Sequence, residues 1–91
     1  MITIQVEEAL LKEVNVSKEA ITYVLRTLET RIQTEKRKRF FLQSTRLDIG
    51  MVLEKKTVQN KVIITIIQII PGDIYLNTGM LTRELQEVLE K

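Results

Sequence analysis

The chain of 91 residues contains no cysteine and no histidine. Without cysteine it can form no disulfide bond and no zinc–thiolate centre, and this absence favours a reducing compartment. Without histidine it lacks the commonest general acid–base and the commonest metal ligand. The sequence therefore predicts a protein that is not an enzyme and that holds neither a metal nor another cofactor.

No segment of the chain is long and apolar enough to predict a membrane-spanning helix. The longest apolar-rich run, residues 62–70, is about half of the roughly 20 residues that such a helix needs. Residues 1–4 lack the basic region and the length of a secretory signal peptide. We therefore expect a cytoplasmic protein without a membrane partner.

Positive charge is concentrated in the middle third of the chain. Residues 31–61 carry nine lysine and arginine side chains against three acidic ones, whereas both flanking thirds are net negative. The charge peaks in the Lys-Arg-Lys-Arg run of residues 36–39. A focused basic patch of this kind attracts polyanions such as nucleic acids. The alternative is a solvated helix end, where cations oppose the negative end of the helix dipole.

The spacing of apolar residues predicts two helices near the N-terminus. Apolar side chains recur at helical intervals over residues 5–14 and again over residues 20–32. Asn15 breaks the first helix, because asparagine tolerates the left-handed conformation in which many helices end. Ser17 is a favoured N-cap for the second helix. We place the end of that helix between residues 34 and 38.

Extended segments dominate the second half of the chain. Gly50 suggests a bulge or a close approach of another backbone, and Gln59-Asn60 is a plausible two-residue hairpin turn. The last strand is apolar on both faces, which predicts a central position in a sheet or cover by a partner subunit. The predicted strands are residues 39–46, 47–58 and 62–70, with a weaker candidate at residues 1–4.

A turn and a final helix complete the predicted fold. Pro71-Gly72 has the residues of a tight turn. A helix opening at Asn77 or Thr78 would present one apolar face, made of Met80, Leu81, Leu85, Val88 and Leu89. The expected fold is therefore one α+β domain over residues 1–91, with two N-terminal helices, a three-stranded antiparallel sheet and a C-terminal helix.

The segment of residues 11–25 resembles a helix-turn-helix. Its sequence is Leu-Lys-Glu-Val-Asn-Val-Ser-Lys-Glu-Ala-Ile-Thr-Tyr-Val-Leu. Asn15 would form the turn, Val16 would anchor it and Ser17 would cap the second helix. The residues from Val16 onward are similar to the recognition helix of lac-repressor-type regulators. With the strands that follow, the resemblance implies a winged helix-turn-helix whose second helix enters the major groove. The alternative is an ordinary amphipathic helical hairpin.

This resemblance implies a small protein that binds double-stranded DNA as a dimer, either a transcriptional regulator or a plasmid or phage accessory factor. The final helix would be the dimer element. The basic residues of the middle third would contact phosphates, which gives affinity without sequence information. The expected DNA contacts are Ser17, Lys18, Thr22, Tyr23, Arg26, Lys36, Arg37, Lys38, Arg39, Lys55, Lys56 and Lys61.

Two alternatives stay open. The order of two helices, a basic hairpin and a last helix is also similar to the histone-like HU proteins, which implies a basic β-arm in the minor groove. The double-sided apolar strand and the apolar last helix also fit a protein-interaction or assembly module, such as a phage- or plasmid-encoded inhibitor.

Overall fold

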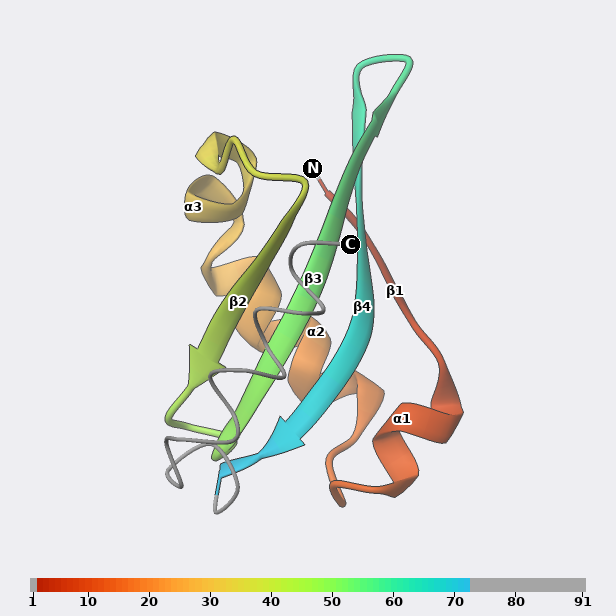
Figure 1. The fold of residues 1–91 in the computed structure, drawn as a ribbon, viewed down its shortest axis with the longest axis vertical. Coiled ribbons are helices and arrows are strands. Elements are labelled where there is room, and N and C mark those ends of the chain that lie inside the picture. Colours follow the sequence, from red (N-terminus) through yellow and green to blue (C-terminus); the bar gives the residue numbers. More distant parts are fainter. Residues whose placement is uncertain (1, 73–91) are drawn as a thin grey trace.

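A computed structural model describes residues 2–72 of the chain, which form a four-stranded sheet with helices packed on one face (Figure 1). The strands lie in the order β1-β4-β3-β2, with β1 parallel to β4 and the other neighbours antiparallel. The elements in chain order are β1 (Thr3–Val6), α1 (Glu8–Lys12), α2 (Lys18–Thr27), α3 (Glu29–Thr34), β2 (Arg39–Ser44), β3 (Ile49–Val58) and β4 (Lys61–Pro71).

The core lies between the sheet and the helices. Alternate residues of each strand point to the helical side, and this alternation buries Phe40 and Leu42 on β2 and Ile64 and Ile66 on β4. The predicted apolar stripe of residues 20–32 packs against these strand residues, and its Leu25 has no exposed surface. Burial of this shared apolar face is what fixes the sheet against α2 and α3.

The central position predicted for the last strand is confirmed, because β4 lies between β1 and β3. The predicted turn is confirmed as well: Gln59 and Asn60 have φ values of 51° and 65° and join Val58 to its partner Lys61. Two positive φ values in a two-residue loop match the twist of the flanking strands. Of the two alternatives predicted for Gly50, the bulge is not there, because the register of β3 on β4 shifts between Val52 and Leu53.

The winged helix-turn-helix prediction is wrong. The first residues form β1, which pairs with β4 and makes the sheet four-stranded and mixed instead of three-stranded and antiparallel. The second predicted helix is two helices, because the backbone breaks at Leu28 (φ −104°, ψ 13°) between α2 and α3. The apolar face of α2 is buried against the sheet core, and α1 is only five residues long. The two helices are therefore supports of a sheet and not a helix pair that projects from the domain.

The local signals within this misassigned segment are nevertheless confirmed. Asn15 has a φ of 51°, in the left-handed region expected at the end of a helix. Ser17 is the N-cap of α2, and its hydroxyl accepts a hydrogen bond from the Ala20 amide at 3.1 Å. Cap and turn residues specify where a helix begins, which is compatible with more than one packing of that helix.

The last described residues, 71 and 72, lie beside the turn that joins β2 to β3. Pro71 is the last residue of β4 and pairs with Ile49, so it belongs to the strand and not to the predicted turn. The Gly72 amide donates a hydrogen bond to the Asp48 carbonyl at 2.8 Å. The predicted final helix and its apolar face lie outside the described residues. Within those residues, no helix has the length and apolar character needed to cross a membrane.

Candidate nucleic-acid interface

The basic run lies in the loop between α3 and β2, beside a part of β3 that β2 does not reach. Strand β2 begins at Arg39, which pairs with Glu54, whereas β3 continues to Val58. The loop and the extended part of β3 therefore flank a hollow of about 460 Å³, which we call the basic groove. Its lining residues are Glu35, Lys36, Arg37, Lys38, Lys55, Lys56 and Thr57.

Lys55 holds the two sides of the basic groove together. Its ammonium group donates to the carbonyl oxygens of Gln33 and Glu35, both at 2.7 Å, and its backbone amide donates to the Lys38 carbonyl at 2.7 Å. The last carbonyls of a helix have no partner within the helix, and a cation there also opposes the negative end of the helix dipole. Lys55 therefore positions the loop, and it is also one of the residues predicted to contact DNA.

Arg37 is held by the acidic residue of the groove. Its Nε donates to Glu35 Oε1 at 2.8 Å and its Nη2 to Oε2 at 3.3 Å, while its backbone amide also donates to Oε1 at 3.1 Å. These hydrogen bonds from the guanidinium and the amide lower the pKa of Glu35 from 4.5 to about 2. Glu35 raises the pKa of Arg37 in turn. An exposed pair of this kind adds little stability, but it fixes the direction of the guanidinium.

Three lysines of the basic groove remain available to a ligand. Lys36, Lys38 and Lys56 are exposed, and their ammonium groups form no hydrogen bond or ion pair with any residue of the described part of the chain. With Arg37 and Lys55 they give the groove five cations against one carboxylate. The groove is thus strongly positive, and no described histidine or buried acid changes that charge near neutral pH.

The other two predicted cations lie outside the basic groove. Arg39 is bound to Glu54, with Nε and Nη2 both 3.0 Å from Oε2, so its charge is locally compensated. Lys61 is exposed at the first position of β4, beside the hairpin turn, and its nearest strand partner is Val58. It is therefore separate from the groove but on the same hairpin as Lys55 and Lys56.

The predicted contacts on α2 gather in a second hollow that shares no residue with the basic groove. This hollow, of about 420 Å³, is lined by Lys18, Glu19, Thr22, Tyr23 and Arg26. Tyr23 is 57% exposed. Arg26 donates to the Ile2 carbonyl at 3.0 Å and lies 3.5 Å from Glu29, so it ties the helix to the start of β1.

Arg46, which sequence reasoning did not single out, lies over the Tyr23 ring at 5.2 Å from its centroid. This contact joins the turn between β2 and β3 to α2. A cation at this distance from an aromatic ring is attracted by the electron-rich face of the ring. No sequence pattern indicates it, because the two residues lie far apart in the chain and only the packing of α2 on the sheet brings them together.

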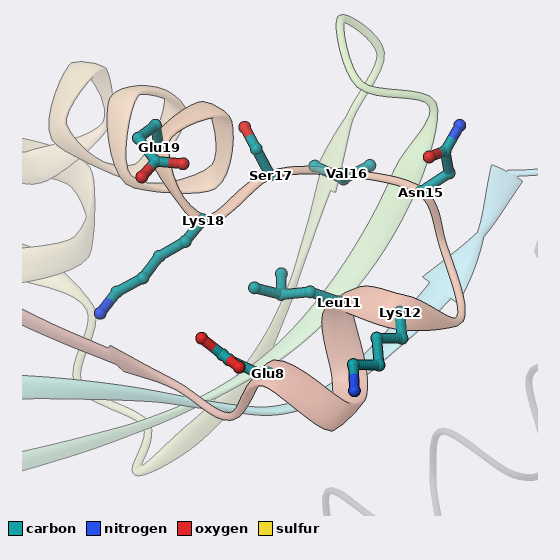
Figure 2. Close-up of a pocket in the computed structure, with 8 residues that line it drawn as sticks. All are labelled: Glu8, Leu11, Lys12, Asn15, Val16, Ser17, Lys18 and Glu19. Carbon is teal, nitrogen blue, oxygen red and sulfur yellow. The ribbon is translucent and has the colours of Figure 1, made fainter.

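Ser17 and Lys18 also line a third hollow, between α1 and the start of α2 (Figure 2). The eight side chains drawn there come from α1, from the turn after it and from the first residues of α2. Lys12 and Lys18 are balanced by Glu8 and Glu19, so the hollow has no net charge. It lacks the excess positive charge that a polyanion site needs, which leaves the basic groove as the strongest candidate interface.

No family model, curated protein or solved structure is significantly similar to this chain. Within the described residues, no group of three or more acidic side chains lies close enough together to bind a metal ion. Any functional assignment therefore depends on the geometry and charge of the basic groove. Two of its residues, Glu35 and Thr57, were not predicted as site residues, although the strand register next to Lys56 places Thr57 there.

Proposed function

We propose that the protein binds double-stranded DNA by phosphate contacts in the basic groove. The observation that supports this function is that cations from two segments, residues 36–38 and residues 55–56, line one open groove with a single carboxylate. Duplex DNA carries about one negative charge per 1.7 Å of its axis, so a cluster of free ammonium groups meets several phosphates at once. The hollows on α2 have less excess positive charge, since one is lined by Lys18 and Arg26 against Glu19 and the other has no net charge.

The free lysines set the expected salt dependence of binding. Lys36, Lys38 and Lys56 in the groove and Lys61 on the same hairpin are exposed cations without a partner among the described residues. Four phosphate contacts predict a slope of about −3.6 in a plot of log K against log salt concentration. Affinity would then fall about 150-fold between 50 and 200 mM salt.

The test is fluorescence anisotropy of a labelled random duplex, measured for two matched double variants. The variant Lys36→Ala/Lys38→Ala removes two groove cations, whereas Lys12→Ala/Lys18→Ala removes two exposed cations beside α1 and α2. We expect the groove variant to lose about 1.8 units of the salt slope and the other variant to keep the full slope. Equal losses would mean diffuse attraction by net charge and would overturn the groove as the site.

The same assay separates DNA binding from the alternative class of function. Absence of salt-dependent binding at low ionic strength would overturn DNA as the partner and direct attention to a protein-interaction module. A DNA partner implies a compartment that contains DNA, which keeps the cytoplasm as the proposed location. We also propose that the protein is a dimer, and this part of the proposal depends on the predicted final helix, which lies outside the described residues.

A further inference from the structure

The hairpin of β3 and β4 extends past the helices and past the other strands (Figure 1). Every residue from Lys56 to Lys61 is exposed. The hairpin is fixed where it leaves the domain, because Lys55 is hydrogen-bonded to the end of α3 on one side. A two-stranded ribbon anchored at its base therefore lies next to the basic groove, and no other described element surrounds its tip.

The dimensions of this ribbon match the major groove of DNA. β1 reaches Ile63, which pairs with Lys56, so the free ribbon consists of the pairs Thr57–Val62 and Val58–Lys61 and the turn. At about 3.3 Å per residue, the three steps from Lys56 to Gln59 project by roughly 10 Å. The major groove of B-DNA is about 12 Å wide and about 8.5 Å deep, and it admits a two-stranded β-ribbon. The minor groove of undistorted B-DNA is only about 6 Å wide, so a two-stranded arm enters it only where the duplex is bent and that groove is opened.

The tip of the ribbon carries base-reading chemistry. Gln59 and Asn60 both end in an amide group, and neither side chain has a hydrogen-bond partner among the described residues. A carboxamide pairs in a bidentate way with N6 and N7 of adenine, donating from its nitrogen and accepting with its oxygen. Val58 beside them is 42% exposed, and such an apolar group suits the methyl group of thymine.

We propose that the β3–β4 hairpin enters the major groove of duplex DNA and that the amides of Gln59 and Asn60 read adenine there. This inference rests on the proposed DNA binding, in which the basic groove contacts the phosphates at the edge of the same groove. Lys56 and Lys61 flank the turn on paired strands, so their side chains reach the phosphates on the walls. Affinity then comes from the cations and preference for A·T pairs comes from the tip.

The test compares duplexes of equal length that are rich in A·T or in G·C pairs, at one salt concentration. The variant Gln59→Gly/Asn60→Gly removes both amides but keeps the turn, because glycine adopts positive φ readily. We expect the wild-type protein to prefer the A·T-rich duplex by about tenfold. The variant should lose that preference while its affinity for the G·C-rich duplex and its salt slope stay unchanged.

A modified base identifies the groove that is read. Replacing adenine with 7-deazaadenine removes the N7 acceptor in the major groove and leaves the minor groove unaltered. The wild-type preference should fall several-fold with this duplex. Salt-dependent binding without any A·T preference would overturn the reading role and leave phosphate binding intact. An A·T preference that survives the double glycine variant or the 7-deazaadenine duplex would also overturn the reading role. If the wild-type protein binds neither duplex, the proposed function itself is overturned.

Discussion

Replacing Lys55 with methionine should both destabilise the protein and weaken its binding to DNA. The methionine keeps the apolar stem of the side chain but removes the ammonium group that donates to the carbonyls of Gln33 and Glu35. Those carbonyls lie at the end of α3 and lose their only described side-chain donor. Among the described contacts, the backbone hydrogen bond between residues 55 and 38 would then be what ties the loop of residues 35–38 to β3.

The size of the effect follows from the exposure of these two hydrogen bonds. A hydrogen bond to a charged group contributes about 1.5–3 kcal/mol when it is buried. Here one bond is exposed and the other is partly buried, so water replaces much of what is lost. We therefore expect a loss of about 1–2 kcal/mol in the free energy of unfolding, since solvation compensates the remainder. In a domain of this size that loss lowers Tm by roughly 5–15 °C.

Lys56→Met is the matched control, because it removes the neighbouring cation, which has no partner among the described residues. Urea unfolding should give the wild-type free energy for Lys56→Met and the reduced value for Lys55→Met. In the anisotropy assay, Lys56→Met should lose about 0.9 units of salt slope, as expected for one phosphate contact. If both variants unfold like the wild-type protein, then Lys55 does not hold the loop and the reasoning is refuted.

Three further outcomes are expected. DNA binding should stay constant between pH 5.5 and 8, because the chain has no histidine and the pKa of Glu35 is lowered from 4.5 to about 2. The stabilising charge of Glu35 is lost only as the pH falls from about 4.5 towards 2. A step in anisotropy within pH 5.5–8 would contradict this prediction. Gly72→Ala should lower the free energy of unfolding by about 1–3 kcal/mol, since the added Cβ would lie 2.7 Å from the Asp48 carbonyl oxygen; an unchanged urea midpoint would argue against this close approach. Leu25→Ala should cost about 2–5 kcal/mol in urea unfolding because Leu25 is fully buried, and a much smaller loss would place α2 away from the core.

Local signals in the sequence were reliable because they depend on a few adjacent residues. The cap at Ser17, the left-handed Asn15 and the turn at Gln59-Asn60 are all present. The arrangement of the elements was not predictable in the same way. The pairing of β1 with β4 joins residues about 60 positions apart, and no periodicity within either segment encodes which neighbour it will take.

The break between α2 and α3 shows why the helix pair was misassigned. The apolar stripe continues through Leu28 to Ile32, so the hydrophobic pattern alone predicts one helix. The backbone nevertheless leaves the α-helical range at Leu28. Both segments still bury their apolar residues against the same sheet, which explains how one stripe serves two short helices. Hydrophobic periodicity therefore predicted the buried face correctly and the number of helices incorrectly.

The candidate interface was predicted as a set of cations but not as a surface. The sequence places residues 36–39 and 55–56 in two separate basic clusters, and the register of β2 on β3 brings them together. The hydrogen bonds then distinguish two kinds of cation. Lys55 and Arg37 have side-chain partners within the protein, whereas Lys36 and Lys38 have none among the described residues. A charge count over the chain cannot make that distinction.

A structural role alone does not account for this distribution of charge. Lysines on an exposed strand protect its edge from pairing with another chain, and Lys55 and Lys56 lie where β3 has no neighbour in β2. Edge protection requires cations on the strand itself, however, and it does not require them on the loop that faces it. Lys36 and Lys38 lie on that loop, so edge protection does not account for them. An anion in the groove would contact cations from the loop and from the strand at once, which is the role proposed for a DNA phosphate.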